Sequence, residues 1–204
     1  MLRTFATLGL LLCAMPAMAR AGESLSTAGL YSFSKGNLTG GVCEDRTCTQ
    51  VRHDGLFHMT TNEEEKSSMV KYLGWYPIDD GTFNLSSNGE TRGLGFVFDR
   101  QAQGTVPLFR YLDSQGSHFF TLNEQEGQNA VSKYGYTAEG ICCYVAMPQL
   151  PGTHAIYRLF DSKSGLHVYT GNSDMKERLR WAYGYTLEGI EGYAWDSAAT
   201  LPAQ

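Results

Sequence analysis

The chain has 204 residues, of which 42% are hydrophobic and 18% are charged, and its formal net charge at pH 7 is −5. This length suffices for one domain of ordinary size, or for a small array of repeats, with a buried core. The acidic balance carries no electrostatic footprint for nucleic acid or anionic membranes, so we expect neither partner. Its 12 Tyr, 10 Phe and 23 Gly favour strands and turns over a helical bundle.

The first 19 residues have the pattern of a secretory signal peptide. Arg3 gives a positive start, an apolar run around Leu8–Cys13 follows, and Ala17-Met18-Ala19 is a small-x-small cleavage site. We expect residues 1–19 to be removed and residues 20–204 to form one repeat domain that is secreted or periplasmic. The apolar run is too short to span a bilayer, and no later run reaches about 18 apolar residues, so we expect no membrane insertion.

Three repeats organise the rest of the chain. The stretch from Pro107 to Val145 is closely copied from Ala155 to Trp195, with a period of about 48 residues that is typical of repeat architectures. A looser first copy is expected ahead of them, because Gly74-Trp75 matches a Gly-Tyr pair in both later copies. The repeats lie at about residues 28–99, 105–146 and 153–196.

The first repeat departs from the other two. It carries extra loops at 35–53 and 77–92, and the register of its second strand is ambiguous. Either Phe57 or His58 can take the position that His118 has in the second repeat.

Each repeat is predicted to have the order strand, strand, helix, strand. An opening strand leads into an Asp-Ser turn, and the second strand carries His118–Thr121 or His167–Thr170. The helices are predicted from their caps, which are Asn62, Asn123 and Asn172 at the start and Gly135 and Gly184 at the end. This order predicts an α+β protein whose repeats form a closed pseudo-threefold domain, similar to a propeller or barrel, because closure leaves few unpaired strand edges.

Four cysteines remain after the predicted cleavage, and an even number in an exported protein favours disulfides. They are Cys43, Cys48, Cys142 and Cys143. Adjacent strand residues point to opposite faces, which disfavours a Cys142–Cys143 bond, but linking both to one short loop needs both faces to reach it. Three pairings stay open, and we favour Cys43 with Cys48 and a vicinal Cys142–Cys143 bond. A zinc site is disfavoured because CxxC spacing is missing, and we expect no metal.

The repeated motifs resemble the secreted HFYT-type repeats of unknown function, which occur in exported bacterial and fungal proteins and read approximately YRxYN, HFYT, GY or GW, and EGI. The matching residues of repeat two are Phe109-Arg110-Tyr111, His118–Thr121, Gly135-Tyr136 and Glu139-Gly140-Ile141. Those of repeat three are Tyr157-Arg158-Leu159, His167–Thr170, Gly184-Tyr185 and Glu188-Gly189-Ile190. The resemblance implies this repeat fold and an extracellular setting. Such repeats are often joined to secreted hydrolases, which suggests recognition, and the family has no established catalytic residue to carry over.

Two histidines recur at the same place in their repeats. His118 and His167 could each act as a general base or as a ligand. A residue that recurs in every copy is explained more simply by packing. We therefore expect each ring to bond a backbone carbonyl or the acid of its own repeat.

Two glutamates recur as well. Glu139 and Glu188 could share acid and base roles in glycoside hydrolysis. Those roles need two different environments, whereas equivalent positions in repeats supply similar ones. Pairing with Arg110 or Arg158 is the simpler interpretation.

Aromatic surface is the remaining candidate for recognition. The aromatic residues that we expect to be exposed are Trp75, Tyr76, Tyr111, Phe160 and Tyr193. Aromatic faces beside polar groups are what sugar or peptide recognition uses.

The sequence therefore predicts a non-catalytic exported module that binds cell-wall or another extracellular carbohydrate without a cofactor. A periplasmic or secreted protein that binds or inhibits another protein through the 35–53 loop is the alternative, and a hydrolase is third. GxSxG, HExxH and P-loop spacings are absent from the sequence, which disfavours an enzyme. The candidate ligand-binding residues are Arg110, Tyr111, Asp113, His118, Glu139, Arg158, Asp161, His167, Glu188, Trp75 and Tyr76.

Overall fold

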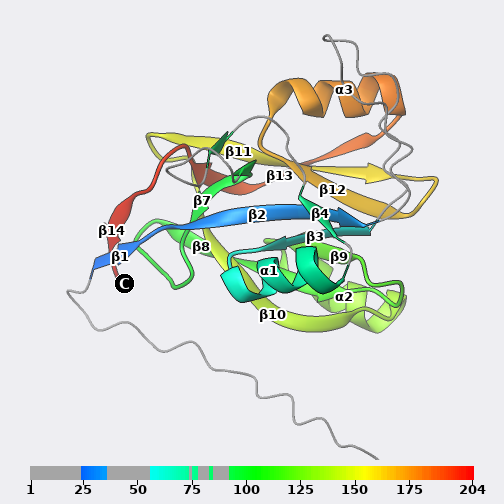
Figure 1. Ribbon diagram of the computed structural model, residues 1–204, viewed down its shortest axis with the longest axis horizontal. Helices are drawn as coiled ribbons and strands as arrows, with labels where there is room; N and C mark the ends of the chain where they lie inside the picture. The colour runs from blue at the N-terminus through cyan, green and yellow to red at the C-terminus, as the bar shows by residue number, and fades with distance from the viewer. Residues whose placement is uncertain (1–23, 36–55, 74, 78–82, 85–91) are drawn as a thin grey trace, which may run out of the picture.

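A computed structural model describes residues 24–35, 56–73, 75–77, 83–84 and 92–204 (Figure 1). The predicted signal peptide, Cys43, Cys48 and most of the two extra loops lie outside these residues. The described part is mostly antiparallel sheet, with 50% strand and 23% helix. None of its helices is long and apolar enough to cross a bilayer.

Units two and three share the order strand, strand, helix, strand. Unit two, residues 105–146, consists of β8 (Thr105–Leu112), β9 (His118–Thr121), α2 (Glu124–Tyr134) and β10 (Thr137–Ala146). Unit three, residues 153–195, consists of β11 (Thr153–Asp161), β12 (Leu166–Thr170), α3 (Ser173–Tyr183) and β13 (Thr186–Trp195). In each unit the first strand pairs antiparallel with both of the others.

Unit one, residues 28–97, follows the same order with an interrupted third strand. It contains β2 (Ala28–Lys35), β3 (Leu56–Thr60), α1 (Glu63–Tyr72), β4 (Tyr76–Pro77) and β7 (Gly95–Val97). Both β4 and β7 pair with β2, and the short hairpin of β5 (Phe83–Asn84) and β6 (Arg92–Gly93) lies between them in sequence. The ends of the described chain are joined by β1 (Ser24–Ser26) and β14 (Thr200–Pro202).

The helices begin and end where their caps predict. The side chains of Asn62, Asn123 and Asn172 accept hydrogen bonds from backbone N–H groups in the first turn of α1, α2 and α3. Gly135 and Gly184 end α2 and α3 with φ of 73° and 76°, in the left-handed region that glycine adopts without steric cost. Both cap predictions are confirmed.

The predicted closed architecture is wrong. Ten strands form one branched sheet with the order β3-β2-β7-β13-β10-β8-β9, to which β11, β12 and β4 add branches. In the described residues the strands close into neither a barrel nor a propeller, and the helices are small, so the fold is mostly antiparallel β rather than α+β. Among the described strands, β3 and β9 end the sheet path and β12 pairs only with β11, so each of these three strands has one edge without a strand partner.

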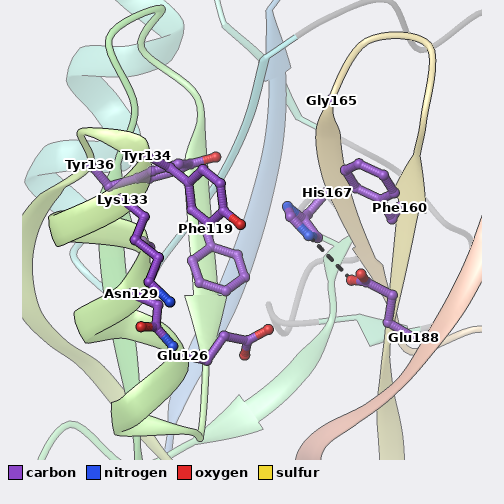
Figure 2. Close-up of a pocket in the computed structure, with 11 residues that line it drawn as sticks. Phe119, Glu126, Asn129, Lys133, Tyr134, Tyr136, Phe160, Gly165, His167 and Glu188 are labelled. Atoms are coloured by element: carbon purple, nitrogen blue, oxygen red, sulfur yellow. Dashed lines mark ion pairs between the residues drawn. The ribbon is translucent and has the colours of Figure 1, made fainter.

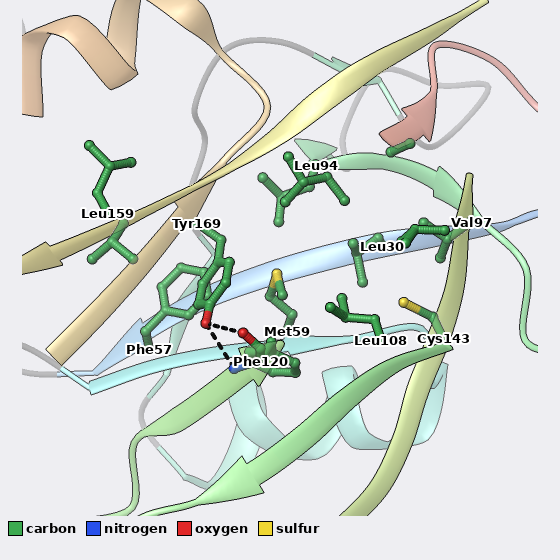
Figure 3. Packing of buried hydrophobic residues seen from close by; sticks show 14 of the residues in the cluster. Leu30, Phe57, Met59, Leu94, Val97, Leu108, Phe120, Cys143, Leu159 and Tyr169 are labelled. Carbon is green, nitrogen blue, oxygen red and sulfur yellow. Dashed lines mark hydrogen bonds between the residues drawn. The ribbon is translucent and has the colours of Figure 1, made fainter. Parts of the chain in front are cut away.

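Side chains, and not backbone ladders, bring these three edge strands together. The rings of Phe57 on β3 and Phe120 on β9 lie 5.3 Å and 5.5 Å, between centroids, from the ring of Tyr169 on β12. Figure 3 shows Tyr169 among the buried residues, with its hydroxyl at the backbone of Phe120. That hydroxyl donates to the Phe120 carbonyl at 2.6 Å and accepts from the Phe120 N–H at 2.8 Å. The three edges therefore meet through these rings and not through a backbone ladder. One tyrosine hydroxyl satisfies the backbone of β9 at this point.

The strand pairing also settles the register of unit one. Thr60, Thr121 and Thr170 pair with Tyr31, Phe109 and Tyr157 at equivalent places in the three hairpins. Counting back from these threonines, Phe57 takes the position of His118 and His167. His58 therefore takes the position of Phe119.

We predict that Tyr169→Phe lowers the free energy of unfolding by about 1–3 kcal/mol, because it leaves a buried N–H and a buried carbonyl of β9 without a partner. Urea denaturation of both proteins measures the difference. Tyr193→Phe is the control, because the hydroxyl of the half-buried Tyr193 makes no hydrogen bond within the described residues. Equal loss of stability in the two variants contradicts the assigned role of the Tyr169 hydroxyl.

Candidate functional site

Arg158 joins unit two to unit three. Its guanidinium contacts Glu126 of α2 through Nη1 and Nη2, at 3.0 Å and 2.9 Å. From unit three, Glu188 approaches Nε and Glu191 approaches Nη1, each at 2.9 Å. The Arg158 side chain is only 9% exposed, so three carboxylates surround one nearly buried cation.

This cation sets the charge of its neighbours. Burial alone would raise the pKa of Glu126, but the hydrogen bonds from Arg158 and Thr121 outweigh burial and lower it. Burial alone would also raise the pKa of Glu188, but contacts with His167 and Arg158 outweigh burial and lower it. Burial dominates at Glu191 and raises its pKa, although its carboxylate also accepts a 2.8 Å hydrogen bond from the Leu122 N–H.

Unit one meets unit two through an equivalent cluster. Arg110 contacts Glu65 of α1 at 3.3 Å and Glu139 of its own unit at 2.9 Å. His118 Nε2 lies 3.0 Å from Glu139, as His167 Nε2 lies 3.2 Å from Glu188. Each histidine therefore contacts the acid of its own repeat, and each glutamate pairs with the arginine of its own repeat, which are the contacts that the simpler interpretation predicts.

The Arg110 cluster differs from the Arg158 cluster because it contains a second histidine. His58, which is 1% exposed, brings its Nδ1 to 2.9 Å from His118 Nδ1. Its Nε2 lies 3.2 Å from Glu65 Oε1, at an angle unsuited to a hydrogen bond. Burial lowers the pKa of His58. The hairpins are tied again where the Phe57 N–H donates to Ser117 Oγ at 3.1 Å.

The equivalent positions in unit one and in α3 do not hold an arginine and a glutamate. Ser32 pairs with Met59 where Arg110 pairs with Phe120 and Arg158 with Tyr169. Met175 follows its helix cap at the place of Glu65 and Glu126. The Ser32 hydroxyl is buried without a hydrogen-bond partner among the described residues.

A pocket of about 560 Å³ opens beside the Arg158 cluster (Figure 2). One wall is α2, which supplies Glu126, Asn129, Lys133 and Tyr134, and the opposite wall is the β11–β12 hairpin with Phe160 and His167. The other lining residues are Phe119, Ala130, Tyr136, Gly165 and Glu188. The His167 ring lies between two rings, 4.9 Å from that of Phe119 and 5.0 Å from that of Phe160. The pocket thus combines aromatic surface with carboxylates, an amide and an ammonium.

The pocket includes only two of the predicted ligand-binding residues, His167 and Glu188. Arg158 lies behind its wall, and Arg110, His118 and Glu139 form the other cluster. Asp113 and Asp161 accept hydrogen bonds within their own turns, from the backbone N–H groups of Gln115 and Ser117 and of Lys163. These two aspartates stabilise turns and do not line the pocket.

The prediction that Trp75 and Tyr111 are exposed is wrong. Trp75 is 8% exposed and packs with Tyr31, Phe33 and Met69. Tyr111 is 6% exposed, and its hydroxyl oxygen would lie 1.9 Å from a Cβ at Gly127, so the ring fills the space that this glycine leaves on α2. The Tyr76 side chain lies outside the described residues, while Phe160 and Tyr193 are half-buried.

The predicted vicinal disulfide is not formed. Cys142 and Cys143 are free thiols, the first half-buried and the second fully buried in the core. A β-bulge between Ile141 and Cys143 makes Cys142 the extra residue of β10, and both side chains pack in the same core cluster. No group of three or more His, Cys, Asp or Glu residues is arranged to hold a metal in the part of the chain that the structure describes.

Several pocket residues were not among the sequence candidates. Glu126 is an acidic residue in the first turn of α2, and its carboxylate reaches Arg158 of the next unit. The sequence signal for this role was its position three residues after the cap Asn123. A side chain at that position can reach back over the start of the helix. Tyr134 and Tyr136 recur as Tyr183 and Tyr185 in the third repeat, whereas Asn129 and Lys133 have no signal in the repeat pattern.

The model of a domain of unknown function (DUF5648) matches residues 49–146. This match covers slightly less than half of the chain and ends with β10, the last strand of unit two. No curated protein and no solved structure matches the chain. The resemblance to HFYT-type repeats is not tested by these comparisons and stays a prediction.

We predict that Glu65→Gln removes part of the acid sensitivity of the fold. Burial alone would raise the pKa of Glu65, but contacts with His58, Thr60 and Arg110 lower it from 4.5 to about 2. A lowered pKa means that Glu65 stabilises the fold fully above pH 4.5 and progressively less as the pH falls toward 2. Urea unfolding across this range is expected to show a gap between wild type and variant that shrinks with acidification. A gap of constant size contradicts the assignment.

Ser32 and Met175, at the positions equivalent to Arg158 and Glu126, suggest a test of the Arg158 cluster. Arg158→Ser is expected to cost about 3 kcal/mol, because it leaves partly buried carboxylates without a cation. Adding Glu126→Met, so that both positions hold the residue types of Ser32 and Met175, is expected to recover part of that loss. Urea unfolding of the two variants and of Glu126→Met alone gives the coupling free energy. A double variant less stable than Arg158→Ser alone overturns this view of the cluster.

Proposed function

We propose that this protein is an exported, non-catalytic module that binds carbohydrate in the pocket between α2 and the β11–β12 hairpin. The pocket itself is the observation that carries the proposal. Its volume of about 560 Å³ lies within the usual range for small-ligand sites. The proposal of export rests on the signal-peptide pattern of residues 1–19.

The lining suits a sugar. The aromatic rings of Phe119, Tyr134, Tyr136 and Phe160 offer flat apolar surface for the C–H faces of a pyranose ring. Glu126, Glu188 and Asn129 offer acceptors and donors for its hydroxyl groups. A few polar groups within an aromatic pocket fix the orientation of a ligand and give specificity.

The same geometry speaks against hydrolysis. Two-carboxylate glycosidases need one carboxyl with a raised pKa to act as the acid. Glu126 and Glu188, the two carboxyls that line the pocket, both have lowered pKa values, because contacts with Arg158 and Thr121 at Glu126, and with His167 and Arg158 at Glu188, outweigh burial. This supports a binding role over a catalytic one.

The alternative, binding of another protein through the 35–53 loop, falls mostly on residues outside the described part. It stays a prediction. Recovery of a protein partner, with no glycan retained, is the outcome that favours it.

We predict that Tyr134→Ala and Phe160→Ala each lower the retention of the protein on insoluble polysaccharides or a glycan array at least about fivefold, because each removes aromatic surface from the pocket. Trp181→Ala is the matched control. Trp181 on α3 is 79% exposed, similar to Tyr134 at 75%, but does not line the pocket. Wild-type protein that binds no glycan overturns the proposal, and equal loss in Trp181→Ala overturns the placement of the site.

A further inference from the structure

Resting on the proposed function, we propose that the pocket selects a sugar unit that carries a protonated amino group, as in a glucosamine polymer, over neutral and N-acetylated sugars. The pocket defines the site, and the charges on its walls define the ligand.

The charges beside the pocket do not balance. Three carboxylates, those of Glu126, Glu188 and Glu191, share the single guanidinium of Arg158. The Glu126 and Glu188 side chains are 37% and 28% exposed, whereas that of Arg158 is 9% exposed. A ligand entering the pocket therefore meets carboxylate oxygen before it meets the cation. Among the described lining residues, Lys133 is the only Lys or Arg.

Glu188 has acceptor capacity to spare. Its Oε2 contacts both Arg158 Nε at 2.9 Å and His167 Nε2 at 3.2 Å. Its Oε1 has no hydrogen bond within the described residues. An ammonium offers three donors and a full charge, so a contact with this oxygen is a charge-assisted hydrogen bond, about twice as strong as one from a hydroxyl.

Aromatic rings complete an environment suited to a cation. Phe119, Tyr136 and Phe160 line the same pocket, and the faces of such rings attract a positive charge. The fold already uses this contact, since the Arg158 guanidinium lies 5.3 Å from the centroid of the Phe119 ring. An N-acetyl group or a hydroxyl in the same place gains neither the ring interaction nor the ion pair.

Isothermal titration calorimetry with three β-1,4-linked tetrasaccharides tests the inference: one of glucosamine, one of N-acetylglucosamine and one of glucose. They share a backbone and differ in the group at one carbon. At about pH 5.5, where an ordinary glutamate is ionised, the glucosamine tetrasaccharide is expected to bind at least about tenfold tighter than the other two. The preference should weaken as salt is added.

The repeats supply a matched control. Glu188→Gln should reduce the preference to near unity. Glu139→Gln should preserve it, because Glu139 makes the same contacts with Arg110 and His118 but lies at the interface of units one and two. Lys133→Met, which removes the cation of the lining, should strengthen binding of the glucosamine tetrasaccharide.

The outcomes separate the two proposals. Equal binding of the three tetrasaccharides overturns the selection of an amine and leaves carbohydrate binding standing. No binding of any saccharide, including capture of a lysine-rich protein instead, overturns both. An equal effect of Glu139→Gln and Glu188→Gln overturns the assignment of the selectivity to this pocket.

Discussion

The buried guanidinium of Arg158 is the contact on which the candidate site depends. A charge that is removed from water persists only where it is paired and hydrogen-bonded, and the planar fork of arginine can meet several carboxylates at once. Glu126 reaches it from α2, while Glu188 and Glu191 reach it from β13. These contacts hold the helix of one unit at a set distance from the hairpin of the next. The two walls of the pocket are the surfaces that this spacing leaves facing each other.

The arginine and the glutamate of such a cluster are present together or both replaced. Arg110 and Arg158 face Glu65 and Glu126, whereas the equivalent strand position of unit one holds Ser32 and the equivalent helix position of α3 holds Met175. Loss of one partner would leave an uncompensated buried charge, which costs far more than loss of both. The unpartnered hydroxyl of Ser32 is a smaller burden than an unpaired carboxylate.

Local signals in the sequence predicted local structure well. Asparagine and glycine caps located the helices because capping depends on a few neighbouring atoms, and the pairing of each histidine with the glutamate of its repeat followed from their recurrence. Closure of the sheet was not predictable in this way. Closure depends on how closely β3, β9 and β12 can approach one another. That distance is set by the packing of the Phe57, Phe120 and Tyr169 rings, which are far apart in the sequence. The bulge at Cys142 is likewise set by the pairing of β10 with β8.

Recurrence in a repeat does not decide whether a residue serves the scaffold or a site. His118 and His167 make the same contact with a glutamate, yet the pocket between α2 and the β11–β12 hairpin is lined by His167 and not by His118. The difference comes from their neighbours. At the first interface His58 meets His118, and Ser117 ties the two hairpins together, whereas the equivalent places at the second hold Phe119 and Leu166, which cannot make these hydrogen bonds. The β11–β12 hairpin is therefore not tied to unit two by these two hydrogen bonds, and space remains between this hairpin and α2. In the proposed function, specificity is carried by positions that differ between copies, such as Lys133 and Phe160, on a frame that the recurring residues build.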